Sequence, residues 1–160
     1  MQLSQIVNIA LEEALKAKNK KEVPVGAVIF NNKKIISKAH NLVQTKKNHM
    51  AHAEILAISK AVKKLNTINL KGYNIYSTLE PCILCSYAIS KHYISKLYFG
   101  SYDIQNGSIE NGTKIFNNNN NFYVPEIYGG IGESKCSEII KSFFRILRKK
   151  WLFSYVFSIE

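Results

Sequence analysis

The chain has 160 residues, enough for one domain with a sizeable core, and 46% of them are hydrophobic, as in an ordinary globular protein. Its three cysteines, Cys82, Cys85 and Cys136, are a sparse, odd set, which argues against a secreted disulfide framework and for a reducing compartment. The net charge of +11 suggests a polyanionic partner such as nucleic acid. Lysine, isoleucine and asparagine are so frequent, however, that a coding bias explains this charge equally well.

The N-terminal segment, residues 1–21, predicts an amphipathic helix. Apolar residues recur at helical spacing, and two glutamates interrupt the apolar run that a signal peptide would need. No stretch approaches the roughly 18 apolar residues of a membrane span. We therefore expect a soluble, cytoplasmic protein with no membrane partner.

Strands and helices alternate through the middle of the chain. Residues 22–40 predict a two-stranded hairpin, in which Asn31 and Asn32 tolerate the positive φ of the turn. Residues 53–65 predict a helix that is apolar nearly all round and therefore buried. Residues 72–79 predict a strand, residues 81–92 a second buried helix opened by Pro81, and residues 94–100 the next strand.

The C-terminal third is less regular. Residues 101–122 predict a long polar loop that ends in a solvated run of five asparagines, 117–121. Residues 122–130 predict a short strand, which Pro125 places at a sheet edge, and a last helix begins near Glu133. This last helix has one apolar face and one basic face. This order of elements predicts an α/β sandwich, with a sheet between helices, as one domain over residues 1–160.

Two short motifs together indicate a metal site. Cys82 and Cys85 share a helical face in the first turn, where the helix dipole lowers a thiol pKa and favours thiolate ligands. Zinc takes sulfur and imidazole ligands in a tetrahedral arrangement, so a histidine makes a third ligand. Cys136 stands alone among apolar neighbours and is expected to be structural. Three protein ligands leave one position open, which is typical of catalytic zinc.

Four histidines are available for the third ligand, and His52 is favoured. It opens a buried helix and so faces out of the helix end, whereas His40 and His49 flank a polar loop and His92 ends the CxxC helix. Glu54 follows closely enough to act as a general acid–base beside the metal. The alternative for Glu54 is a glutamate that only stabilises the helix through its favourable interaction with the helix dipole. A CxxC motif alone is equally compatible with a redox pair.

The quoted motifs resemble a known family. "HAEI" with "TLEPCILC" is the H-x-E…P-C-x-x-C signature of zinc-dependent nucleobase deaminases. The segments "EVPVGAVI", "AHN", "YFGSYD" and "FFRILR" resemble the bacterial tRNA-specific adenosine deaminases over roughly residues 5–150. The resemblance implies a cytidine-deaminase-like three-layer α/β/α sandwich with a mixed five-stranded sheet. It also implies a homodimer and hydrolysis of the wobble adenosine of a tRNA anticodon stem-loop to inosine.

The resemblance assigns roles to individual residues. One Zn²⁺ would be held by His52, Cys82 and Cys85, and Glu54 would carry protons between water and the base. The remaining matches concern substrate binding: they are Val23, Asn41 and Ala53 at the adenine pocket, Asp103 at the adjoining sugar-phosphate, and Phe144 and Arg145 on the C-terminal helix. Two segments depart from the family pattern, the loop 104–121 and the apolar tail 151–160, whose simplest role is a cap on the core or on a dimer.

Other functions are compatible with the motifs. A deaminase of free guanine, cytosine or their nucleosides needs the same metal chemistry without a basic surface. A zinc-stapled RNA-binding module explains the charge and the cysteines but gives Glu54 no role. A DNA cytosine deaminase shares the signature, but the matches outside the zinc motifs favour the tRNA enzyme.

Overall fold

The structure is a computed structural model that describes residues 2–117 and 121–156, and side chains within these ranges as far as residue 148. Its centre is a five-stranded sheet in the order β2-β1-β3-β4-β5. The strands are β1 (Gly26–Phe30), β2 (Ile35–His40), β3 (Asn74–Leu79), β4 (Lys96–Ser101) and β5 (Glu126–Tyr128). Strand β1 pairs antiparallel with β2 and β3, whereas β3, β4 and β5 are parallel. The predicted mixed five-stranded sheet is confirmed.

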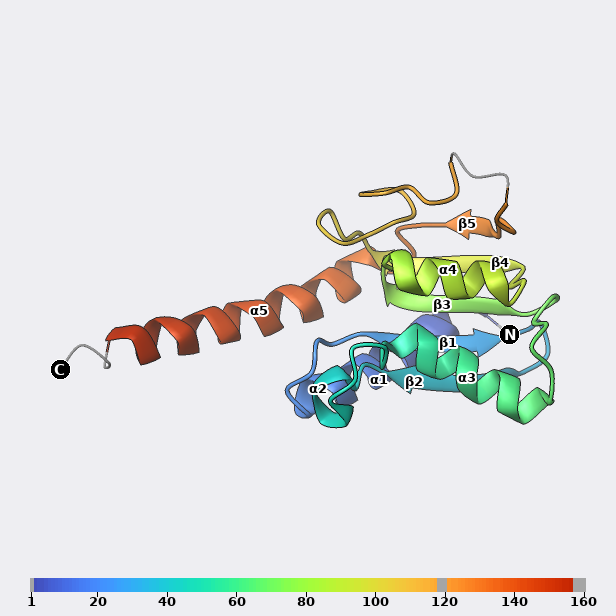
Figure 1. The fold of residues 1–160 in the computed structure, drawn as a ribbon. Coiled ribbons are helices and arrows are strands. Elements are labelled where there is room, and N and C mark those ends of the chain that lie inside the picture. Colours follow the sequence, from blue (N-terminus) through green and yellow to red (C-terminus); the bar gives the residue numbers. More distant parts are fainter. Residues whose placement is uncertain (1, 118–120, 157–160) are drawn as a thin grey trace.

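Helices cover both faces of the sheet, which gives three layers (Figure 1). Helices α1 (Leu3–Asn19) and α5 (Glu133–Val156) pack on one face and touch each other. Helices α3 (Ala53–Leu65) and α4 (Ile83–Lys91) lie on the other face, and a short helix α2 (Val43–Lys46) precedes α3. The three-layer α/β arrangement expected from the sequence is therefore correct.

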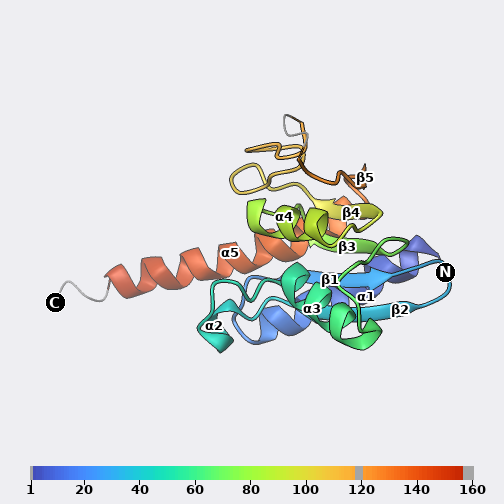
Figure 2. The same ribbon diagram turned by 45° about the vertical axis from the view of Figure 1, so that its right-hand side comes forward.

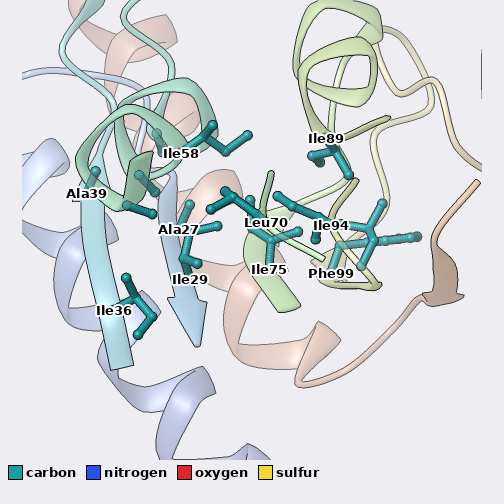
Figure 3. Packing of buried hydrophobic residues seen from close by; sticks show 14 of the residues in the cluster. Ala27, Ile29, Ile36, Ala39, Ile58, Leu70, Ile75, Ile89, Ile94 and Phe99 are labelled. Atoms are coloured by element: carbon teal, nitrogen blue, oxygen red, sulfur yellow. The ribbon is translucent and has the colours of Figure 1, made fainter. Parts of the chain in front are cut away.

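Apolar side chains fill the space on both sides of the sheet. The larger cluster joins the sheet to α3 and α4, and Figure 3 shows several of its isoleucines together with Leu70 and Phe99. A smaller cluster lies between α1 and the sheet, and its buried members are Ile6, Val7, Ala10, Val28, Phe30 and Tyr76. Burial on both faces explains why β1 has only apolar or small residues along its length, and the polar side chains of β3 are buried as well.

Two local expectations need correction. The hairpin turn after β1 places neither Asn31 nor Asn32 at positive φ. Instead, Asn31 Oδ1 accepts the backbone N–H groups of Lys33 and Lys34 at 3.0 and 2.9 Å, an Asx-type turn that needs no left-handed residue. Pro81 does not open α4, because Cys82, in extended conformation, is the N-cap and the helix begins at Ile83.

The last helix extends beyond the body of the molecule. Its first turns pack against β4, and its C-terminal half runs away from the sheet (Figures 1 and 2). The backbone of residues 151–156 continues this helix, while residues 157–160 of the apolar tail lie outside the described part. Among the described helices, none is both long and apolar enough to cross a bilayer.

Strand β2 forms one edge of the sheet, and helix α3 reaches it through two lysines. Lys60 Nζ donates to the Lys38 carbonyl and Lys64 Nζ to the Ile36 carbonyl, each at 3.0 Å. At the other edge, β5 has three residues and follows buried Pro125, as the sequence predicts.

Candidate active site

The two sequence motifs meet because two helices begin at the same end of the sheet. His52 is the N-cap of α3 and Cys82 is the N-cap of α4, so both side chains leave from helix ends instead of helix flanks. Cys85 lies in the first turn of α4 and is fully buried. Strand β3 leads directly into Pro81 and Cys82, so the pairing of β3 with β1 and β4 fixes this junction.

The three ligand atoms have the spacing of a tetrahedral metal site. His52 Nδ1 lies 3.5 Å from Cys82 Sγ and 3.4 Å from Cys85 Sγ, and the two sulfurs are 3.7 Å apart. Zn–N and Zn–S bonds at tetrahedral angles require separations of about 3.6 Å for N···S and about 3.8 Å for S···S. The residues therefore fit a zinc ion without rearrangement. They are the one group of metal-binding geometry among the described residues.

The same contacts favour a thiolate at the mouth of the site. The hydrogen bond between the two thiols and the one with His52 lower the pKa of Cys82 to about 4, despite its burial. The same thiol contact, together with burial, raises the pKa of Cys85 well above its ordinary value. The hydrogen bond to Cys82 raises the pKa of His52. A cation held here replaces these shared protons, which is the usual chemistry of a Cys-Cys-His zinc site.

Glu54 lies beside the ligands and is almost completely buried, with 4% of its surface exposed. Its Oε1 accepts the Ser77 hydroxyl at 2.9 Å, and its Oε2 lies 3.5 Å from Cys85 Sγ. Burial raises the pKa of Glu54, and neither contact supplies a positive charge from a basic side chain. A buried carboxyl group whose pKa is raised in this way binds a proton more readily than an exposed one, which suits a general acid–base.

A cavity of about 610 Å³ opens over His52, Cys82 and Glu54. This volume is in the range of small-molecule sites. Five predicted substrate-binding residues line it: Val23, Asn41, Ala53, Asp103 and Phe144. The walls come from distant parts of the chain, which are the segment before β1, the segment after β2, the loop after β4 and helix α5.

One predicted substrate-binding residue lies outside this cavity. Arg145 lines a second, shallower hollow along α5, together with Lys141 and Glu138, while its neighbour Phe144 lines the first. Two other histidines also have partners elsewhere: His40 Nδ1 pairs with Glu13 at 2.7 Å, and His92 Nδ1 contacts the Ile68 carbonyl at 2.8 Å. Cys136 is buried, 3.3 Å from the Tyr76 hydroxyl, as expected for a structural thiol.

Two buried glutamates of the cavity wall were given no role from the sequence. Glu22 accepts the backbone N–H groups of Gln44 and Thr45 and the side-chain amide of Asn41, at 3.2, 2.6 and 3.2 Å. Glu80, inside the "LEPC" motif, accepts hydrogen bonds from the loop after β4. Both glutamates lie within motifs quoted from the sequence, and that position was the available signal of a role. The role itself could not be predicted, because their hydrogen-bond partners lie far along the chain.

The fold and the metal-ligand set define a class of protein. Residues 1–101 match the family model of the cytidine and deoxycytidylate deaminase zinc-binding region. The chain therefore belongs to this deaminase family, and the family's zinc-binding region and the His52–Cys82–Cys85 cluster together indicate one zinc site.

Curated relatives narrow the assignment within the class. The chain is 43% identical over 141 residues to the tRNA-specific adenosine deaminase of Rickettsia bellii, covering 87% of this chain and 97% of the relative. It is 40% identical to the tRNA-specific adenosine deaminase of Bacillus subtilis, covering 88% of each. The chain belongs to the tRNA-specific adenosine deaminases.

Solved structures agree with this assignment. A structure from studies of A-to-I editing by tRNA:A34 deaminases at the wobble position of transfer RNA matches with a TM-score of 0.83 and 36% identity, over 85% of this chain and 99% of that one. A guanine deaminase from Nitrosomonas europaea matches with a TM-score of 0.72 at 18% identity, a likeness that shows the shared fold alone.

Proposed function

We propose that this protein hydrolyses adenosine at the wobble position of a tRNA anticodon stem-loop to inosine and ammonia. The observation that carries the proposal is the cluster of His52, Cys82 and Cys85 beside Glu54, with His52, Cys82 and Glu54 lining an open cavity. The likeness to tRNA-specific adenosine deaminases over most of the chain supports adenosine in tRNA as the substrate. We further propose that it works as a cytoplasmic homodimer, as its resemblance to the family implies.

Each site residue has a chemical task in this proposal. His52, Cys82 and Cys85 hold Zn²⁺, which when bound lowers the pKa of a coordinated water toward 7. Glu54 takes the proton from the attacking water and delivers protons to the purine ring and to the departing amino group. Water adds its oxygen at C6 and the amino group leaves as ammonia, so atoms and protons balance.

The substrate residues hold a base that has left its stack. A base in an anticodon loop is unpaired, so flipping it into a pocket costs less than extraction from a duplex. Asn41 hydrogen-bonds the base, Val23 and Ala53 pack against it, and Asp103 contacts the adjoining sugar-phosphate. Phe144 and Arg145 contact the neighbouring nucleotides from α5. The side-chain amide of Asn41 donates to Glu22 at 3.2 Å, which orients its carbonyl oxygen as an acceptor for the base.

The test is deamination of an unmodified anticodon stem-loop with adenosine at the wobble position. Nuclease digestion and mass spectrometry measure inosine, with free adenosine, cytosine and guanine as competing substrates. We expect inosine in the stem-loop and no turnover of the free compounds. Turnover of a free base beside an untouched stem-loop would retain the metal chemistry and refute the RNA assignment.

Glu54→Gln separates an enzyme from a binding module. The substitution preserves shape but removes the proton-accepting group, so we expect the rate to fall about 10²–10⁴-fold while the protein keeps one zinc per chain. Zinc content is measured by mass spectrometry of the purified protein, and exposed Glu126→Gln, on the edge strand, is the matched control. An unchanged rate for Glu54→Gln, with zinc retained, would show that this carboxylate is not the proton carrier.

A further inference from the structure

One wall of the cavity is a loop without regular secondary structure. The segment after β4 carries Asp103 and Asn106, which both line the cavity. Its one strand-like contact in the region is an isolated bridge between Gly107 and Cys82. Figure 1 shows this segment above α4 and β4, outside the packed layers. Because helices and strands do not fix its shape, another interaction must hold Asp103 and Asn106 in place.

That interaction centres on the Glu80 carboxylate, of which 2% is exposed. Glu80 Oε1 accepts the backbone N–H groups of Ile109, Glu110 and Asn111 at 3.1, 2.9 and 2.9 Å. Glu80 Oε2 accepts the Asp103 N–H at 3.1 Å and the Asn111 side-chain amide at 2.7 Å. A carboxylate offers about four lone-pair sites, so five donors saturate it.

The surroundings of Glu80 contain amide dipoles in place of a counter-ion. The ion pairs of the described residues involve Glu13 and Glu126, not Glu80. Successive N–H groups that converge on one oxygen form an anion-binding concavity, here closed around a carboxylate of the same chain. Gly107 permits this close wrapping, because a Cβ at that position would lie 2.5 Å from Glu80 Cδ.

The anchor also determines where the substrate-facing residues lie. The Asp103 N–H is held by Glu80, and Asp103 Oδ1 in turn accepts the N–H groups of Gln105 and Asn106 at 3.1 and 3.0 Å. Farther along, Ser108 donates its N–H and its hydroxyl to the Pro81 carbonyl, each at 3.0 Å. Loss of the carboxylate would leave the Ser108 bonds intact but remove the bond that holds the Asp103 N–H. The segment that presents Asp103 and Asn106 would then be released, while the metal ligands stay in place.

We propose that Glu80 is a positioning residue that shapes the loop 103–111 into the RNA-facing wall of the cavity. It thereby sets the affinity for the stem-loop without taking part in the chemical step. This inference rests on the proposed function for its substrate, but the anchoring of the loop is a separate physical claim.

Glu80→Gln tests the inference, because the amide keeps one accepting oxygen and replaces the other with a donor. At least two of the five N–H donors then lose their partner. We expect KM for the stem-loop to rise about tenfold or more, kcat to stay within about threefold, and zinc to stay bound. Amide hydrogen exchange, read by mass spectrometry or NMR, should accelerate at positions 103 and 109–111.

Two further variants keep the test decisive. Glu126→Gln removes one negative charge from the exposed edge strand and should leave KM and exchange in the loop unchanged. Asn111→Ala removes one donor and leaves the four backbone bonds to Glu80, so it should raise KM less than Glu80→Gln. If Glu80→Gln proves too unstable to purify, the Asn111→Ala effect on KM and exchange decides the question.

The outcomes distinguish this inference from the proposed function. Unchanged exchange at 103 and 109–111 in Glu80→Gln overturns the anchoring, whatever the activity. A loss of kcat at constant KM, or a loss of zinc, overturns the positioning role and places Glu80 with the metal centre. Failure of the wild-type protein to deaminate the stem-loop refutes the proposed function, while accelerated exchange would still support the anchored loop.

Discussion

Four glutamates of this chain are buried almost equally, yet their surroundings give them different chemistry. Glu13, Glu22, Glu54 and Glu80 are each at most 4% exposed. Burial tends to raise the pKa of all four carboxyl groups, but hydrogen bonds lower it below the ordinary value in Glu13, Glu22 and Glu80. Only Glu54 keeps a raised pKa. The partners of a buried carboxyl, more than its depth, separate an acid–base candidate from a structural anchor.

Glu13 predicts a pH-dependent contribution to stability. Burial is outweighed by hydrogen bonds from Lys16 and His40, both at 2.7 Å, so the pKa of Glu13 lies below its ordinary 4.5 in the folded state. Its contribution is complete above the unfolded-state value and is lost as pH falls through the lowered folded-state value. We expect Glu13→Gln to be destabilised at pH 7 and to lose less stability than wild type below about pH 4.5.

Urea unfolding between pH 7 and pH 3 measures this effect. Glu12→Gln is the matched control, because Glu12 is the exposed neighbour on the same helix. Equal acid sensitivity in Glu13→Gln and wild type would contradict the assignment of this pH dependence to Glu13.

The sequence predicts the site residues unevenly for a physical reason. His52, Glu54, Cys82 and Cys85 lie in two short motifs whose spacing follows from local helix geometry, and the structure brings these side chains together. The role of Glu80 depends on donors 23 to 31 residues away along the chain. Local spacing carries no information about such distant partners. The role of Glu80 could therefore not be predicted from the sequence, although the residue lies inside a recognised motif.

At the scale of elements, the approach of α1 to the sheet depends on one glycine. Gly26 begins β1, and a Cβ there would overlap the Ala10 carbonyl oxygen and lie 2.8 Å from the Ala14 nitrogen. These atoms belong to the backbone of α1, which cannot yield as a flexible side chain can. The bare backbone at Gly26 therefore lets α1 pack directly on the strand that leads from the cavity wall.

Gly26→Ala should consequently push α1 off the sheet. We expect a loss of about 3 kcal/mol in the free energy of unfolding, at the upper end of overpacking effects. Gly72→Ala is the comparison, because Gly72 has a φ of +85° and open space around its missing Cβ, so only backbone strain of about 1 kcal/mol is expected. Denaturant unfolding of both variants checks the order, and a smaller loss for Gly26→Ala would refute the packing argument.

Periodicity predicted the elements better than their ends. The apolar spacing of residues 53–65 predicts helix α3 with the bounds that the structure shows. The predicted start of α4 was two residues early, because proline statistics favour a first helical position and do not detect that Cys82 is the cap. Strand β5 has three residues, too few for periodicity to define its bounds.

At the scale of the whole molecule, α5 carries both cavity-lining side chains and exposed arginines. Phe143 and Leu147 line the cavity from one side of the helix, and the exposed Arg145 and Arg148 lie on other sides of the same turns. An RNA that inserts one base into the cavity would place its neighbouring phosphates close to these arginines. The contribution of the +11 net charge to RNA binding can then be tested by changing individual basic residues.

The double variant Arg145→Ala with Arg148→Ala should weaken stem-loop binding and its dependence on salt. Each lost phosphate contact lowers the slope of log Kd against log salt by about 0.7 to 0.9. Lys33→Ala with Lys34→Ala removes the same charge at the hairpin turn, at the end of β1 remote from the cavity-lining Val25. Equal slopes for the two double variants, measured by fluorescence anisotropy, would show that the charge acts only through its sum.

The two lysines that reach from α3 to β2 also have a consequence for association between copies. An edge strand presents free carbonyl groups that can pair with a strand of another molecule and start aggregation. The ammonium groups of Lys60 and Lys64 donate hydrogen bonds to two of these carbonyls on β2. A strand of another molecule would have to displace them before it could pair with β2. The opposite edge offers only the short β5. Lys60 and Lys64 therefore oppose pairing of β2 with strands of other molecules. This role accounts for part of the positive charge of the chain without any nucleic-acid partner.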